Sequence, residues 1–317
     1  MPDNTTTTTA GVSSDAASGI DLAKPRKQWK VVMRRFFRHR AAIVGMVVFA
    51  LLVLFSVFGP MLWKYDASDL NLGRYQAPSV DHPFGTGQIG DDVFAKVLSG
   101  TGFSMQIALV AALINTAVGV VLGSIAGYYR GWVDSAVSRL TDLVLVIPTF
   151  LIAAVLSRST FSTAELSQGG GSSNWLQVAI ILGLTNWMIT ARTVRGMVLS
   201  LREKEFVEAA RALGGGPGRV IFRHILPNTM DVVIVNATIA MAQAVLLESA
   251  LSFVGLGVKY PDTSLGLLIS ENQNELLVHP WLFYFPFIFI VLISLSVNFV
   301  GDGLRDAFDP RQKRVRA

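Results

Sequence analysis

Long apolar runs separated by short polar segments dominate the chain. Ala41 to Trp63 contains no charged residue, and a helix of this length crosses the roughly 30 Å hydrocarbon core of a bilayer. Five further stretches have the same character. By residue number, the predicted spans are 41–63, 103–127, 140–157, 175–194, 231–257 and 281–301. The pattern predicts an all-α integral membrane protein with six transmembrane helices.

Details of the runs refine these spans. Lys96 and Arg130 bracket 33 uncharged residues, which is more than one crossing needs, so we expect an interfacial segment before the second span. Pro148 and Pro286 fall inside predicted spans, and each is expected to kink a helix or to begin one. Composition agrees with a membrane protein, because 51% of the residues are hydrophobic and only 15% are charged.

Basic residues are unevenly distributed between the connections. Of 27 Lys and Arg residues, 22 lie in the two terminal segments and in two connections, and 5 lie in the other three connections. Lys and Arg accumulate in cytoplasmic loops, so both termini and the segment 200–229 are predicted to be cytoplasmic. The net charge of +5 is explained by the basic residues of the predicted cytoplasmic segments, so no nucleic-acid partner is expected.

Residues 1–28 are rich in Thr, Ser and Ala, and are expected to form a disordered cytoplasmic tail before a single transmembrane domain, 29–317. The chain has no cysteine, and its four histidines lie in separate segments, so no metal site is predicted. Gly85 to Gly90 fits G-x-G-x-x-G but follows His82-Pro83 instead of a strand, and no Gly-Lys-Ser/Thr phosphate loop occurs. The chain is predicted to be non-catalytic.

A charged segment at 203–228 interrupts the apolar pattern. Residues 203–213 are rich in strong helix formers, and the Gly-Gly-Gly-Pro that follows must end this helix. Arg219–Ile225 offers one or two further helical turns before Pro227 leads into the fifth span. One face of the first helix carries Phe206, Ala209, Ala210 and Leu213. Composition alone leaves two interpretations open, an ordinary surface hairpin and a docking element for a partner.

Polar groups in the fifth span are candidates for a translocation path. Glu248 is the ionisable residue deepest in an apolar segment, which marks it for function unless a loop hydrogen bond or snorkelling satisfies it. Asn236 and Gln243 are seven residues apart and share one stripe, which suits either interhelical hydrogen bonds or the wall of an aqueous path.

The second span carries glycine at every fourth position. Gly119, Gly123 and Gly127 leave one helix face without side chains, which favours close approach of another helix. The alternative is a membrane helix that merely tolerates glycine.

The hairpin segment resembles a known motif. Glu208-Ala209-Ala210, then Gly214, then Leu226-Pro227 is similar to the EAA loop of permease subunits of ATP-binding-cassette importers, the loop that docks on the cytoplasmic ATPase. The resemblance therefore implies an ATPase-coupling role for Phe206, Glu208, Ala209, Ala210, Leu213 and Gly214.

Other stretches resemble the C-type permease of the dipeptide and oligopeptide branch. They are His82–Thr86, Ala126–Tyr128, His224–Asn228, Glu248–Val258 and Gly301–Arg311. His224 stands where many permeases outside this branch have isoleucine. The sequence departs from the branch at Gly87 and Asp91, where Asp and Arg are usual, which puts charge pairing in that outer loop in doubt.

The resemblance implies the type I importer permease fold and a set of partners. These are a homologous B-type permease that forms the other half of the pore, two cytoplasmic ATPases that carry the ATP and Mg²⁺, and an extracytoplasmic peptide-binding protein. It also implies a bacterial cytoplasmic membrane location and alternating access. Other cargoes on the same scaffold, such as a nickel chelate or haem, stay open, and an ion-coupled carrier is a weaker alternative because only Glu248 approaches mid-span.

Overall fold

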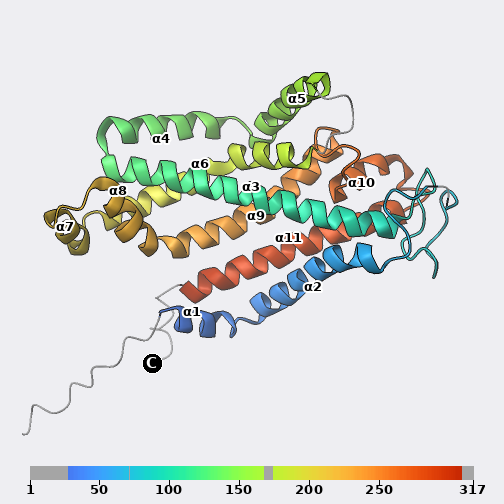
Figure 1. Cartoon of the computed structure of the whole chain (residues 1–317), viewed down its shortest axis with the longest axis horizontal. Helices are drawn as coiled ribbons and strands as arrows, with labels where there is room; N and C mark the ends of the chain where they lie inside the picture. The colour runs from blue at the N-terminus through green and yellow to red at the C-terminus, as the bar shows by residue number, and fades with distance from the viewer. Residues whose placement is uncertain (1–27, 71, 168–173, 309–317) are drawn as a thin grey trace, which may run out of the picture.

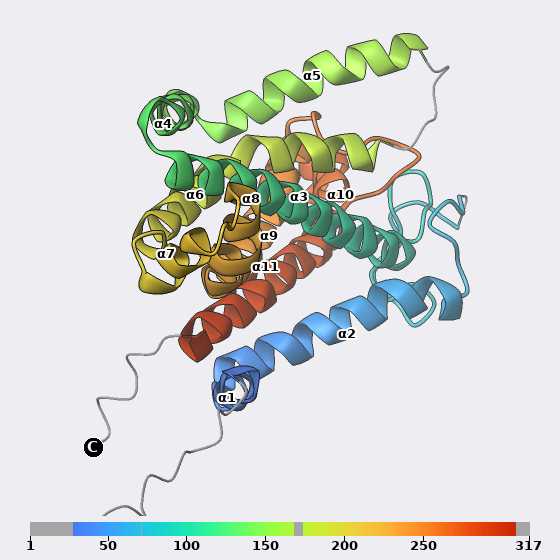
Figure 2. The ribbon, with the colours of Figure 1, turned by 60° about the vertical axis from the view of Figure 1, so that its left-hand side comes forward.

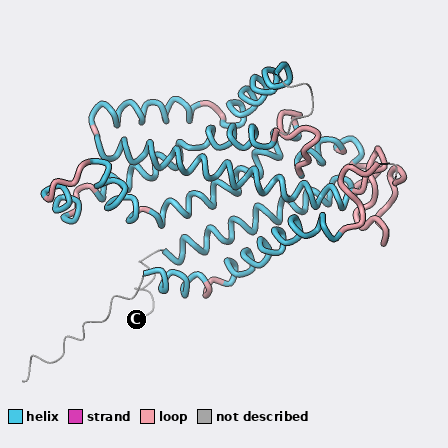
Figure 3. Tube along the Cα trace, viewed as in Figure 1, coloured by secondary structure: helices cyan, strands magenta, loops and turns pink. Residues whose placement is uncertain are grey.

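The computed structural model describes residues 28–70, 72–167 and 174–308, so the predicted tail lies almost wholly outside it. Within these residues the regular structure is helical, apart from one isolated bridge between Thr86 and Asp92 (Figures 1 and 3). The longer helices are α1 (Gln28–Phe36), α2 (Arg40–Leu62), α3 (Val93–Tyr129), α4 (Gly131–Val146), α5 (Thr149–Ser167), α6 (Trp175–Leu201), α9 (Met230–Phe253) and α11 (Trp281–Phe308). Shorter helices are α7 (Glu205–Ala212), α8 (Pro217–Val220), the turns Ile221–Ile225, Leu226–Asn228 and Gln273–Glu275, and α10 (Leu265–Glu271).

Four of the described helices, α2, α3, α9 and α11, are long and apolar enough to cross a membrane, and the bent pair α4–α5 would make a fifth. α6, which contains the predicted fourth span, has 27 residues but is less apolar than these helices. It carries polar side chains along its length, including Gln177, Asn186 and Arg192. It nevertheless packs along α3 inside the bundle (Figure 2).

α3 is the longest helix and corrects one expectation. Its 37 residues span about 55 Å at roughly 1.5 Å per residue, so the segment before residue 103 is not a separate interfacial element but the start of the same helix. The helix begins where it does because Asp92 is its N-cap, with Oδ1 accepting a hydrogen bond from the N–H of Ala95 at 2.8 Å. The sequence prediction missed this cap.

The glycine face of α3 packs against α6, as predicted. A Cβ on Gly123 would meet the carbonyl oxygen of Ala191 at 2.4 Å, and one on Gly119 or Gly127 would meet side-chain and backbone atoms of α6 at 3.0 Å or less. Backbone atoms cannot yield as a side chain can, so only glycine permits this approach. The seam between the two helices depends on these missing side chains.

The predicted third span is broken. α4 ends at Val146, Ile147 is extended, and α5 begins at Thr149, so that the two helices meet at 88°. Pro148 explains the break, because the residue before a proline is driven out of the α region. We expected a kinked or restarted helix here, and the structure shows two helices. The start of α5 packs on the main apolar cluster through Phe150 and Ala153, and the rest of α5 stands away from the bundle (Figure 2).

Two of the apolar clusters in the described residues matter for the site, and they lie toward opposite ends of the bundle. The larger joins α3, α6, α9, α10 and α11, and it includes Phe55 of α2 stacked on Phe289 of α11 with ring centroids 4.9 Å apart. The smaller joins α6 and the start of α9 to the segment 205–228. α1, α7, α8 and the C-terminal end of α11 lie at that second end (Figure 1), which we call the hairpin end.

Candidate functional site

The hairpin consists of α7, α8 and the two turns that follow, residues 205–228. α7 ends in two hydrogen bonds: the N–H of Gly214 bonds the carbonyl of Arg211 at 2.9 Å, and that of Gly215 bonds Ala210 at 3.0 Å. This is a Schellman motif, which needs a left-handed residue just past the helix. Gly214 provides it with φ of +81°. The predicted exit at Gly214 is therefore confirmed.

The second limb of the hairpin departs from regular α-helical geometry. Pro217 opens α8 at its first position, where its missing N–H costs nothing. A π-helical turn at Ile221–Ile225 and a 3₁₀ turn at Leu226–Asn228 then lead directly into α9. The sequence predicted helical turns here, but it did not predict the π turn. No extended linker separates the hairpin from α9, so a displacement of one acts on the other.

The inner face of the hairpin is fixed to the bundle by apolar contacts. Val207, Val220 and Ile225 are fully buried and pack in one cluster with Val194 and Val198 of α6 and Val233 of α9. Arg211 adds a cation–π contact, its guanidinium carbon lying 5.1 Å from the centre of the Tyr128 ring of α3. The hairpin is thus seated on three of the long helices.

The outer face of the hairpin exposes large apolar side chains. Leu213 is 88% exposed, Phe222 is 67% exposed and Phe206 is 41% exposed, while Glu208 and Ala209 are exposed around them. Exposed apolar side chains on a polar segment are typical of protein or membrane interaction sites. One member of the predicted face differs, because Ala210 is half-buried against the inner cluster. Phe222 was missed, since helical spacing could not be extrapolated through the glycines and the π turn.

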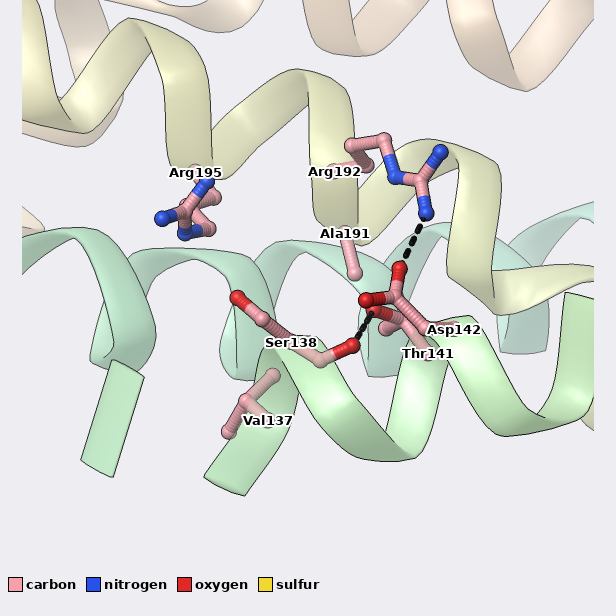
Figure 4. Close-up of a pocket in the computed structure, with 7 residues that line it drawn as sticks. All are labelled: Val137, Ser138, Thr141, Asp142, Ala191, Arg192 and Arg195. Atoms are coloured by element: carbon pink, nitrogen blue, oxygen red, sulfur yellow. Dashed lines mark hydrogen bonds and ion pairs between the residues drawn. The ribbon is translucent and has the colours of Figure 1, made fainter. Parts of the chain in front are cut away.

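A cavity of about 380 Å³ lies between α4 and α6 (Figure 4). Arg192 bonds Asp142 of α4, with Nη2 and Oδ1 2.6 Å apart, and Arg195 Nη2 bonds Oδ2 of Asp134 at 2.8 Å, with a second bond from its Nε. Ser138 of α4 also lines this cavity. Both arginines of α6 are thus paired with aspartates of α4, and no cluster of three metal-ligating residues occurs in the part of the chain that the structure describes. These ion pairs hold the two helices together beside the cavity.

The predicted path residues fall in three different settings. The carboxylate of Glu248 is fully buried, and accepts hydrogen bonds from Ser252 at 2.7 Å and from Ser104 and Ser249 at 3.5 Å. Asn236 is half-buried, and its amide donates to the Val232 carbonyl of its own helix at 3.0 Å. Gln243 is exposed. Asn236 and Gln243, seven residues apart on α9, share a helix stripe, whereas Glu248 lies inside the protein.

The loop before α3, predicted to lie outside, forms a charge pair in spite of its unusual sequence. Asp91 Oδ2 lies 2.9 Å from Lys96 Nζ, and both side chains are largely buried. A Cβ on Gly87 would lie 2.6 Å from Oδ1 of Asp91, so glycine at 87 makes room for the carboxylate at 91. The two departures from the family pattern therefore belong to one arrangement. Gly85–Gly90 lies in this loop, outside any strand–helix unit of the described residues, as expected for an incidental motif.

A second cavity, of about 600 Å³, opens beside this loop, between the start of α3 and α10. Its lining includes Asp91, Lys96 and Glu271. Burial raises the pKa of the Glu271 carboxyl group, because the surrounding protein displaces water from it. The positive charge of Lys96 opposes this increase in the pKa, and the negative charge of Asp91 adds to it. This end of the molecule therefore offers a hollow with a charged wall.

Comparison with known proteins decides the family. Residues 119–314 match the model of the binding-protein-dependent transport system inner membrane component, and residues 27–78 match the N-terminal transmembrane domain of oligopeptide transport permease C. The chain belongs to this transport-component family. Its members are permease subunits. The hairpin at 205–228 lies within the matched residues 119–314, and it is therefore a feature of a permease.

Curated relatives extend this similarity over most of the chain. It is 38% identical over 287 residues to the oligopeptide transport system permease protein OppC of Mycobacterium tuberculosis, covering 90% of this chain and 96% of the relative. It is 36% identical over 304 residues to OppC of Bacillus subtilis (94% and 96%). It is 37% identical over 287 residues to the dipeptide transport system permease protein DppC of Alkalihalophilus pseudofirmus (90% of each).

A solved structure supports the fold independently. An inward-facing form of the MetNI methionine ABC transporter superposes with a TM-score of 0.52 at 18% sequence identity, covering 68% of this chain and 97% of the other. The all-α fold of an importer permease is therefore shown by both the family and the structure.

Proposed function

We propose that this chain is the permease subunit of an ATP-driven importer of dipeptides or oligopeptides in a bacterial cytoplasmic membrane. It forms half of the translocation pore, beside a homologous B-type permease. The cargo is supported by relatives that are named as oligopeptide and dipeptide permeases and match about nine tenths of the chain. Coupling is supported by one observation above all, a hairpin whose apolar outer face is exposed while its inner face is buried in the bundle.

The hairpin converts ATPase movement into helix movement. Two cytoplasmic ATPases, which carry the ATP and Mg²⁺, contact Phe206, Leu213 and Phe222 from outside. Their closure pushes on an element that continues into α9 and packs on α6. Since a ligand shifts a conformational equilibrium only through different contacts in the two states, this joint is where the ATPases favour one state over the other.

An extracytoplasmic peptide-binding protein delivers cargo to the opposite end of the bundle. Of the residues predicted for the path, Asn236 and Gln243 retain that role, because neither amide is committed to a hydrogen bond with another described helix. Glu248 has a structural role instead. Its contact with Ser104 joins α9 to α3.

Transport by the reconstituted complex tests this function. The chain is co-expressed with the partners encoded for it, purified and placed in proteoliposomes, with Mg-ATP on the ATPase side and binding protein with radiolabelled tripeptide on the other. We expect ATP-dependent accumulation of tripeptide that unlabelled peptide competes away. Accumulation of a nickel chelate or haem, with no transport of peptide, would contradict the proposed cargo.

Topology follows from the charge distribution and has its own test. The chain contains no cysteine, so single cysteines report cleanly. Cysteine at Ser79 or Thr263 is expected to react with a membrane-impermeant thiol reagent added outside cells, and cysteine at Ser200 is expected to react only after permeabilisation. External labelling at Ser200 would invert the topology and remove the hairpin from the cytoplasm.

A further inference from the structure

A third cavity, of about 420 Å³, lies at the hairpin end between α6, α9 and α11. Its polar lining consists of Asp231, Asn236, Arg305 and Thr193, and its apolar lining includes Val232 and Ile239. Pockets of this size accommodate small organic ligands. The cavity is separate from the one between α4 and α6 and shares none of its lining residues.

The charges of this cavity are not used for internal pairing. Asp231 lies in the first turn of α9 and Arg305 in the last turn of α11, positions that suit the helix dipoles. Within the described residues neither side chain forms an ion pair. Asp231 accepts only the N–H of its neighbour Val232, at 2.9 Å. By contrast, Arg192 and Arg195, at the other cavity, are both paired with aspartates.

The helix dipoles explain why each charge is tolerated, but not why both charges line one cavity without an ion pair between them. Unpaired, they offer a cationic fork and an anionic group to one ligand, and the amide of Asn236 on α9 and the hydroxyl of Thr193 on α6 belong to the same lining. A guanidinium binds a carboxylate through two parallel hydrogen bonds, and a carboxylate binds an ammonium group. The complementary ligand is a small zwitterion with an apolar middle.

We propose that this cavity binds a short peptide on the ATPase side of the membrane, with Arg305 holding its α-carboxylate and Asp231 its α-ammonium group. Val232 and Ile239 contact its side chains, and Asn236 and Thr193 face its backbone. The inference rests on the proposed function and adds a site to it, a place where the cargo is held after crossing. Because Arg305 is solvent-exposed, binding is weak enough to allow release.

Equilibrium binding to the intact nucleotide-free complex in nanodiscs tests the site, with no binding protein present. The probes are radiolabelled trialanine, its C-terminal amide and its N-acetyl form. In the wild type, each blocked form is expected to bind about tenfold more weakly, the effect of losing one charge-assisted contact. Arg305→Gln should weaken the binding of free trialanine about tenfold, and this variant should bind the C-terminal amide as tightly as it binds free trialanine. Asp231→Asn should likewise weaken the binding of free trialanine about tenfold, and it should bind the N-acetyl form as tightly as free trialanine.

Controls separate the inference from its alternatives. Arg139→Gln removes an exposed arginine of α4 that lines none of the three cavities, and it should leave all three affinities unchanged. If Arg305→Gln still prefers free trialanine to its amide tenfold, the assignment of the carboxylate is overturned. Loss of co-purified phosphatidylethanolamine in that variant, without any change in peptide discrimination, would show a lipid headgroup site and overturn the proposal. Peptide transport by the wild type, measured separately, distinguishes failure of this site from failure of the proposed function.

Discussion

Leu213→Asp is expected to abolish ATP-driven peptide uptake while leaving the subunit folded and inserted. The side chain is 88% exposed at the outer face of the hairpin, so the change removes no packing within the subunit. In the complex it would place a carboxylate in an apolar contact with the ATPase, where an unpaired buried charge is strongly unfavourable. We expect at least a tenfold loss of uptake, with ATPase subunits lost from the purified complex or no longer stimulated by peptide.

Two variants give this result its meaning. Leu277→Asp makes the same change at a residue that is 94% exposed but lies toward the opposite end of the molecule, and it should retain the ATPases. Glu208→Ala should act mildly, because an exposed helix carboxylate exchanges its partner for water at little cost. Uptake at the wild-type rate in Leu213→Asp, at equal protein level, would show that the hairpin is only a surface feature.

Gly123→Val is expected to prevent α3 from packing on α6. A Cβ at this position would lie 2.4 Å from the carbonyl oxygen of Ala191, and 3.1 Å from its carbonyl carbon and Cα. The neighbour is backbone, so the helices must separate. Overpacking of a core commonly costs about 1–3 kcal/mol, and a clash along this seam should exceed that range. Fluorescence-detected size-exclusion chromatography should show loss of most of the monodisperse subunit.

Gly196→Val is the matched control. It introduces the same side chain into α6, where a Cβ would meet nothing within 4 Å, so the subunit should elute as the wild type does. Equal recovery and equal thermal stability of the two variants would mean that the α3–α6 seam does not depend on close approach.

Local sequence signals predicted the features of the fold that depend on a few neighbouring residues. Glycine at 214 indicated the exit from α7 because the Schellman motif requires a left-handed residue there. Glycines at spacing four indicated the α3 seam because they fall on one helix face. In both cases the physical requirement is contained within a single segment.

Features that depend on distant segments could not be predicted. The expectation that Pro148 kinks a helix or begins one gave no angle, and the 88° between α4 and α5 does not follow from the local sequence. The contact of Arg192 with Asp142 joins residues 50 apart, and the cavity shared by Asp231 and Arg305 exists only because the ends of α9 and α11 lie together. The candidate peptide site was invisible in the sequence for the same reason.

Native mass spectrometry of the complex purified through a tag on this chain would establish which subunits assemble with it. We expect one copy of this chain with one copy of a second, homologous permease and two ATP-binding-cassette ATPases. We also expect the ATPases to dissociate in the Leu213→Asp variant before the two permeases separate. A transport-competent homodimer of this chain without any ATPase would show that the chain is not half of an ATPase-coupled pore.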